Sequence, residues 1–130
     1  MLEAVRDAAS KRSEKQPISV LIVDDNSFLV DSFKLIMEFA GFKVETARSG
    51  DEALRKARTI RFDLALVDLN LPDLSGAELS STLKENTPSM SVMLLTGSAG
   101  ASDKGVDGVI ANPIDPEELI KISRSLNDNL

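Results

Sequence analysis

The sequence predicts a doubly wound α/β domain, and three observations lead to this prediction. Short, β-branched apolar runs of the kind found in strands buried on both faces recur along the chain. Segments with apolar residues at helical spacing lie between these runs. The strand and helix units follow one another about every 20 residues, which implies right-handed crossovers and a parallel sheet covered by helices on both faces. The 130 residues have room for one such domain.

The first half of the domain is expected to supply three strands and two helices. The run ISVLIV at 18–23 is apolar apart from Ser19 and predicts the first buried strand. Apolar residues then recur at helical spacing over 28–40, and Gly41 offers a C-terminal cap. The remaining elements of this half are a strand at 42–47, a helix at 51–60 and a strand at 63–69 that ends near Asp68.

The second half continues the alternation with a helix at 75–86, a strand SVMLLT at 91–96 and a strand DGVIA at 107–111. The last helix is expected at 115–126. Pro116 occupies its first position, and Glu117 and Glu118 lie in its first turn, where the helix dipole favours carboxylates. Five strands alternating with helices complete the predicted domain.

Residues 1–17 differ from the rest because they are rich in helix formers but end in a polar run closed by Pro17. This composition fits either a short extra helix or a loose arm. We therefore expect an arm or helix at 1–17 and the domain at 18–130.

Composition excludes several classes of site. The chain has no cysteine and no histidine, so disulfides, serine triads, cysteine proteases and histidine-bound zinc are excluded. No apolar run approaches the roughly 20 residues that a membrane span needs, and nothing marks the chain for export, so we expect a cytoplasmic protein that makes no membrane contact. A net charge of -6 disfavours direct nucleic-acid binding. Cations and proteins are the expected ligands.

Polar residues follow three of the predicted strands: Asp24 and Asp25 follow the first, Asp68 the third and Thr96 the fourth. In a doubly wound sheet the ligand site lies beyond the carboxyl ends of the strands. Three carboxylates brought to one edge repel one another unless a cation neutralises them. A hard divalent cation suits such oxygen ligands, and Mg²⁺ is the first candidate.

These motifs resemble those of the receiver domains of two-component response regulators. The acidic pair after the first strand matches Asp24 and Asp25, the acceptor motif matches Asp68-Leu69-Asn70-Leu71-Pro72 with the following Gly76, and the hydroxyl after the fourth strand matches Thr96. The likeness extends over nearly all of the predicted domain. It implies a flavodoxin-like fold with strand order 2-1-3-4-5.

The resemblance also implies a role for each site residue. Asp68 would accept the phosphoryl group, and Thr96 would be the switch hydroxyl. Mg²⁺ would be held by Asp25, Asp68 and the backbone carbonyl of Asn70, with Asp24 acting through a water molecule. The implied partners are a histidine kinase or phosphotransfer protein and an unidentified downstream protein. Such a domain is a phosphoacceptor rather than an enzyme, and a monomer or weak dimer is expected.

The sequence departs from the family pattern in three places. The family has lysine before the proline that follows the fifth strand, and this chain has Asn112 before Pro113, which brings amide donors but no charge. Val109 replaces an aromatic residue that moves with the switch hydroxyl. The stretch at 97–111 is several residues shorter than the family's fourth helix and fifth strand together need. It contains four glycines, each costing a helix about 1 kcal/mol, so the helix before the fifth strand is expected to be shortened or absent.

These departures leave an alternative function open. A pseudo-receiver would keep the fold and the acidic pocket as a protein-interaction module independent of phosphorylation. A magnesium phosphohydrolase is disfavoured, because Asn70 stands where such enzymes generally place a second acid. An NTPase lacks support, since the chain has no glycine-rich loop ending in Lys-Ser or Lys-Thr.

Overall fold

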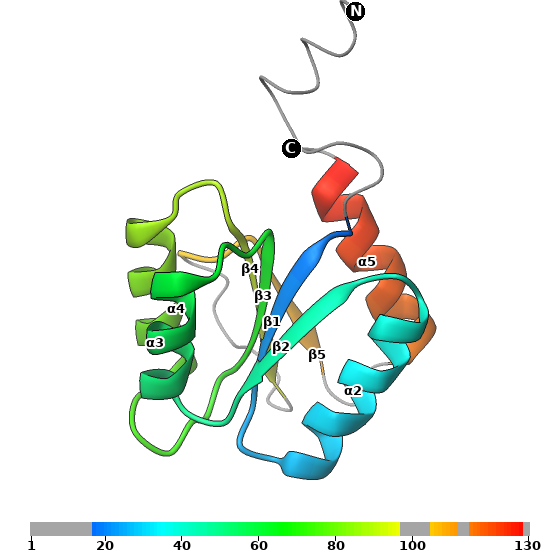
Figure 1. Ribbon diagram of the computed structural model, residues 1–130. Helices are drawn as coiled ribbons and strands as arrows, with labels where there is room; N and C mark the ends of the chain where they lie inside the picture. Colours follow the sequence, from blue (N-terminus) through cyan, green and yellow to red (C-terminus); the bar gives the residue numbers. More distant parts are fainter. Residues whose placement is uncertain (1–16, 97–104, 112–114, 129–130) are drawn as a thin grey trace, which may run out of the picture.

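The computed structural model describes residues 17–96, 105–111 and 115–128 (Figure 1). Five parallel strands form one sheet in the order β2-β1-β3-β4-β5, which confirms the predicted fold class and strand order. The strands are β1 (Ser19–Val23), β2 (Lys43–Ala47), β3 (Leu64–Asp68), β4 (Ser91–Thr96) and β5 (Gly108–Ala111). The helices are α2 (Ser27–Phe39), α3 (Gly50–Thr59), α4 (Gly76–Asn86) and α5 (Pro116–Asp128).

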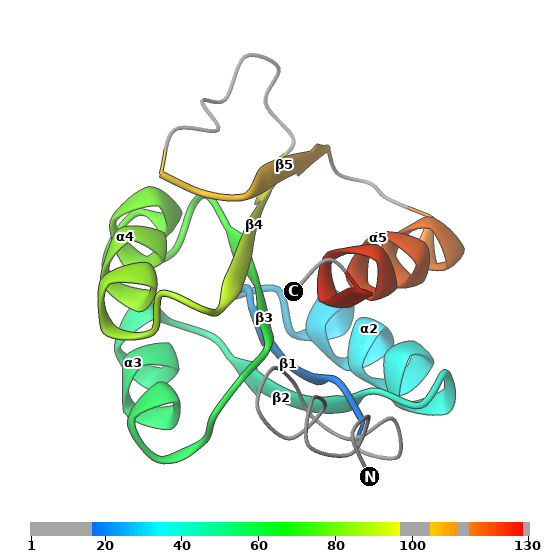
Figure 2. The same ribbon diagram turned by 90° about the horizontal axis from the view of Figure 1, so that it is seen from above.

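The helices cover both faces of the sheet, as Figure 2 shows: α3 and α4 lie on one side, and α2 and α5 on the other. Residues of β1 alternate between the two layers. Val20 and Ile22 pack with α2 and α5, whereas Leu21 and Val23 pack with α3 and α4. All four are fully buried, so β1 is apolar from Val20 to Val23 because both of its faces are covered.

Side chains next to the helices fix where three of them begin. The Asn26 side chain accepts from the Leu29 N–H at 3.1 Å and caps α2. Ser49 caps α3 in the same way, and Ser75 forms a reciprocal capping box with Glu78 at α4. The capping serines explain why α3 begins one residue earlier and α4 one residue later than the patterns predict.

Gly41 ends α2 as predicted, with a φ of 101° that other residues rarely adopt. At the far end of the chain, the Arg124 side chain donates to the Ala40 carbonyl at 2.8 Å and lies 5.6 Å from the centre of the Phe42 ring. This contact joins α5 to the end of α2.

Some predictions concern residues that the structure does not describe. The helix or arm at 1–17 lies outside the described residues apart from Pro17, and so does the segment at 97–104, where the helix before the fifth strand was expected to be shortened or absent. Gly105–Asp107, the described residues before β5, form a turn and a bend. No helix in the described part of the chain is long and apolar enough to cross a membrane.

Candidate functional site

The site lies at the carboxyl edge of the sheet, where β1 and β3 end next to each other. Each of Asp24, Asp25 and Asp68 offers a carboxylate oxygen, and these oxygens all lie within 4.8 Å of one another. The expected convergence of the three carboxylates is therefore present. It results from the parallel pairing of β1 with β3, which sets Val23 opposite Val67.

Asp24 is the buried member of this group, with 4% of its surface exposed. Its backbone N–H donates to the Ala47 carbonyl at 3.0 Å, which holds it beside the end of β2. Its carboxylate accepts from the Asn26 N–H at 2.9 Å. Burial raises the pKa of Asp24, and the neighbouring Asp25 charge adds to this, while the Asn26 N–H opposes it. The exposed Asp25 completes the pair.

Asp68 is the last residue of β3 and is half-buried. Burial and then the Asp24 charge raise the pKa of Asp68 to about 6, against the opposing effect of the Asn70 N–H. The carboxylate is thus held in surroundings that disfavour its charge. A cation at this edge would reverse the effect, because an opposite charge within a few ångströms favours the ionised form.

The donor set fits a hard divalent cation. Three carboxylates within reach of one ion, two of them with raised pKa values, form a site whose repulsion is relieved by positive charge. Asn70, whose backbone carbonyl is the fourth predicted ligand, is exposed two residues beyond Asp68. The residues present therefore suit Mg²⁺.

The loop that follows Asp68 is held close to β3 by its backbone. The Leu69 N–H donates to the Leu95 carbonyl at 2.9 Å, and the Gly76 N–H donates to the Leu69 carbonyl at 2.7 Å. A Cβ on residue 76 would lie 2.2 Å from the Asp68 carbonyl oxygen. Glycine is therefore required at this position, so the stretch from Pro72 to Gly76 is more than an ordinary turn.

Asp73 has a structural role that the sequence reasoning missed. Its carboxylate accepts from the Gly50 and Asp51 N–H groups, each at 2.9 Å, at the beginning of α3. These two bonds lower the pKa of Asp73. The acid thus fastens the loop after β3 to a neighbouring helix, and no local sequence signal joins residues so far apart.

Thr96 ends β4, the strand next to β3, and is buried. Asp68 pairs with Leu95, so Thr96 lies one residue beyond the strand partner of Asp68. Ala111 is the partner of Thr96 on β5, and Asn112 follows directly but lies outside the described residues. Val109 is half-buried and packs against the α3 and α4 layer, as expected of an ordinary packing residue.

Comparison with known proteins agrees with this geometry. A model of the response regulator receiver domain matches residues 20–124. The probable transcriptional regulatory protein TcrX of Mycobacterium tuberculosis is 31% identical over 122 residues, which are 89% of this chain and 52% of TcrX. The chain thus spans about half the length of the curated relatives it matches.

Solved structures give the same result. A receiver domain protein from Methanospirillum hungatei JF-1 superposes with a TM-score of 0.80 at 36% identity, covering 87% of this chain and 96% of that one. TrrA from Thermotoga maritima, in complex with Mg(2+)-BeF, superposes with a TM-score of 0.77 at 25% identity, covering 84% and 98%. The family match, the strand order and the acidic edge agree, and the chain belongs to the response regulator receiver domain family.

Proposed function

We propose that this chain receives a phosphoryl group on Asp68 from a histidine kinase or phosphotransfer protein, with Mg²⁺ required, and relays the signal to a protein partner in the cytoplasm. The observation that supports this most is the position of Asp68. Its half-buried carboxylate ends a central strand and meets two further carboxylates at one edge. Membership of the receiver family supports the same function.

In the proposed reaction a carboxylate oxygen of Asp68 forms a bond to phosphorus, and the bond between phosphorus and the donor nitrogen breaks. The imidazole leaves with the electron pair of that bond and takes up a proton. The product is an acyl phosphate on Asp68. The protein contributes position and charge, because phosphoryl transfer requires little other covalent chemistry from it.

Asp25, Asp68 and the Asn70 carbonyl would hold the Mg²⁺, with Asp24 acting through a water molecule. When bound, the ion neutralises charge on the transferring group and on the carboxylates. The chain's own contribution is to keep Asp68 from moving away. The bonds from Leu69 to β4 and from Gly76 to Leu69 fix the backbone that follows it.

Thr96 would contact the phosphoryl group through its hydroxyl, since it lies on the adjacent strand one residue beyond the partner of Asp68. Asn112 would add amide donors where the family has a lysine charge. The chain would act as a phosphoacceptor and not as an enzyme on free substrates.

The alternative is a pseudo-receiver that binds its partner without phosphorylation. The half-buried, non-aromatic Val109 favours it, because a small branched side chain in this packing cannot rotate as an aromatic switch residue does. Asn112 favours it as well, because without an ammonium group a bound phosphoryl group gains less from the fifth strand.

Intact mass after incubation with acetyl phosphate tests the proposal. With Mg²⁺ the wild type should gain one phosphoryl group, and neither Asp68→Asn nor the wild type in EDTA should gain any. A mass gain retained in Asp68→Asn would place the acceptor elsewhere. No gain in the wild type at saturating Mg²⁺ would favour the pseudo-receiver.

A second measurement separates phosphorylation from switching. Amide NMR spectra of the wild type and Asn112→Lys are compared with and without beryllofluoride and Mg²⁺. Small shifts in the wild type and larger ones in Asn112→Lys would show that the missing charge limits the switch. Equal, extensive shifts would show a complete switch without lysine.

A further inference from the structure

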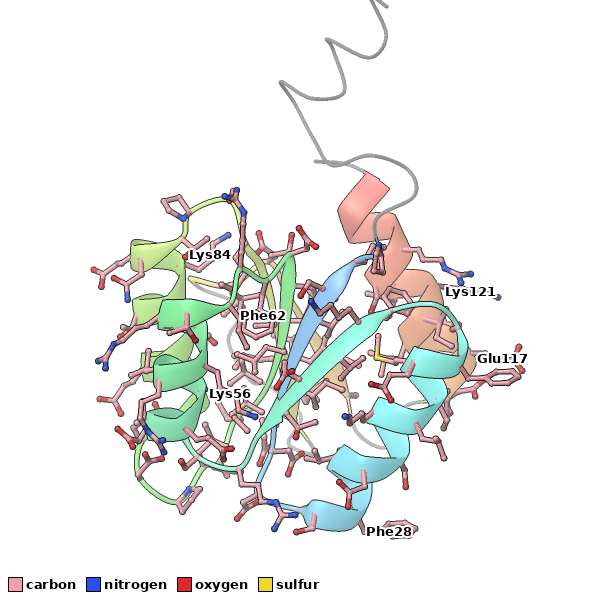
Figure 3. The ribbon with its side chains drawn as sticks, viewed as in Figure 1. Phe28, Lys56, Phe62, Lys84, Glu117 and Lys121 are labelled. Carbon is pink, nitrogen blue, oxygen red and sulfur yellow. The ribbon has the colours of Figure 1, made fainter. Side chains whose placement is uncertain are left out.

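Helix α2 has a second apolar face that the fold does not use. Phe28, Leu35 and Phe39 are 81%, 70% and 95% exposed, and they are the exposed large hydrophobic residues in the described part of the chain. At 100° per residue they lie within about 40° of one another on the helix. Figure 3 shows Phe28 at the first turn of α2, pointing away from the sheet.

The face opposite to these residues is the one that packs on the sheet. Val30, Phe33 and Met37 are the buried residues of α2, and they project from the other side of the helix. A surface helix normally carries polar residues opposite its buried face. The outer apolar face therefore adds nothing to the folding of this domain, and it exposes aromatic rings to water.

The spacing along this outer face is that of a coiled-coil seam. Together with Ser32, the three exposed residues follow one another at intervals of four, three and four, which is the d-a-d-a order of a heptad repeat. The seam of Phe28, Ser32, Leu35 and Phe39 is uncharged. It therefore provides apolar contact area for another helix of the same kind.

The size of this seam predicts weak association. With about 180 Å² for each large side chain, the three residues expose roughly 450 Å². Two such faces bury about 900 Å² together, and Leu29 and Ile36, which are half-buried along one edge of the seam, bring the total to roughly 1,000 Å². That total is near the lower limit for a specific protein interface.

The charges beside the seam indicate how two copies would meet. Asp31 and Glu38 lie along one edge, with Lys34 bound to Glu38 at 3.5 Å, and Leu29 and Ile36 lie along the other edge. In a parallel pair of helices each acidic edge lies against the partner's apolar edge. An antiparallel pair would instead bring the carboxylates of the two copies together.

We infer that the outer face of α2 is the interface of a weak, parallel homodimer of this chain, formed through the seam of Phe28, Ser32, Leu35 and Phe39. A two-fold axis requires one surface to pack against its own copy, and the uncharged seam can do so in a parallel pair, where the two acidic edges stay apart. At Phe28, three residues after Asp25, the interface adjoins the acidic edge of the sheet, but it uses none of the three carboxylates and does not depend on the proposed phosphoryl transfer.

Charge provides a second signature of this dimer. Each copy has a net charge of -6, so two copies repel through solution while their seams attract. Salt screens the repulsion, and association should strengthen as salt concentration rises. Binding of a basic partner to the acidic edge of α2 would show the opposite dependence.

Sedimentation velocity of the full chain, from micromolar to millimolar concentration, tests the inference. The wild type should form a dimer that strengthens with salt. Leu35→Gln should weaken the dimer about tenfold or more, because each copy loses one buried leucine. Ala77→Gln, on the exposed side of α4, is the matched control and should dimerise like the wild type. Because residues 28, 35 and 39 are exposed, their glutamine variants should stay folded, which circular dichroism checks.

Three outcomes would overturn the inference: a wild type that remains monomeric at millimolar concentration, a dimer that persists when all three residues are glutamine, or a dimer that weakens with salt. A monomer whose Phe28 and Phe39 rings show NMR contacts to residues 1–16 would also overturn it. That last result would assign the seam to the chain's own amino-terminal segment.

Discussion

Replacing Asp68 with asparagine should stabilise the metal-free protein at neutral pH. The folded chain binds a proton at Asp68 more tightly than the unfolded chain does, because burial and the Asp24 charge raise its pKa from 3.8 to about 6. Stability is therefore lost as pH rises through this interval. Asparagine keeps a similar shape but has no charge to bury, so Asp68→Asn avoids the loss.

The size of this stabilisation follows from the difference between the pKa values of Asp68 in the folded and unfolded chains. A difference of about 2.2 pKa units at 1.36 kcal/mol each sets an upper limit of about 3 kcal/mol. Solvent screens a half-buried carboxylate, so we expect about half of this, roughly 1.5 kcal/mol. At about 4 °C per kcal/mol for a domain of this size, the Tm of Asp68→Asn should exceed that of the wild type by about 6 °C above pH 6.

Asp73→Asn is the matched control, with the opposite sign. The Gly50 and Asp51 N–H groups lower the pKa of Asp73, so its charge stabilises the fold above the unfolded pKa, and this stabilisation is lost as pH falls through the folded value. Asp73→Asn should therefore lower the Tm at neutral pH. Both variants exchange an aspartate for an asparagine, so any effect of the exchange itself is common to the two.

Thermal unfolding followed by circular dichroism, in EDTA and at pH values from below 3.8 to above 6, checks both variants. Mg²⁺ should then raise the Tm of the wild type but have little effect on Asp68→Asn. If the Tm of Asp68→Asn exceeded that of the wild type by the same amount at every pH, or did not exceed it above pH 6, the argument from repulsion and burial would be refuted.

Other positions give simpler expectations. Gly76→Ala should cost about 2 kcal/mol in urea unfolding, because its Cβ would meet the backbone at the end of β3 at 2.2 Å. Arg124→Gln should cost about 1 kcal/mol, since it removes the bond to Ala40 and the contact over Phe42, and thermal unfolding would show it. Ser80→Ala should be neutral or stabilising by up to about 1 kcal/mol, because the buried Ser80 hydroxyl has no hydrogen-bond partner among the described residues; calorimetry would decide.

The fold could be predicted because strands that are buried on both faces are apolar at successive positions of the sequence. Residues 20–23 and 64–67 are apolar without alternation, and the structure places them alternately in two covered layers. The outer face of α2 was harder to identify. Phe28 fits the helical spacing of apolar residues but belongs to the exposed face. When a helix has two apolar faces, this spacing does not distinguish the buried face from the exposed one.

The site could be predicted in part for a related reason. Parallel strands end at one edge, so the positions of Asp24, Asp25 and Asp68 in the sequence were enough to bring them together. The contact between Asp73 and the start of α3 could not be predicted, because it joins residues 22 apart through loop geometry. The close approach of residue 76 to β3 likewise depends on the folded backbone.

The rigidity of this edge leaves Asp68 few ways to relieve its repulsion with Asp24. Bonds through Leu69 and Gly76 hold the backbone after β3, and burial holds Asp24 in place, so the carboxylates cannot separate. Binding of a proton or of a cation relieves this repulsion, and the two compete for the Asp68 carboxylate. Mg²⁺ affinity, measured by calorimetry, should therefore fall as pH drops below about 6, approaching tenfold per pH unit for one displaced proton. An affinity that stays constant from pH 7 to pH 5 would show that Asp68 is not among the ligands, or that its charge is not suppressed by its surroundings.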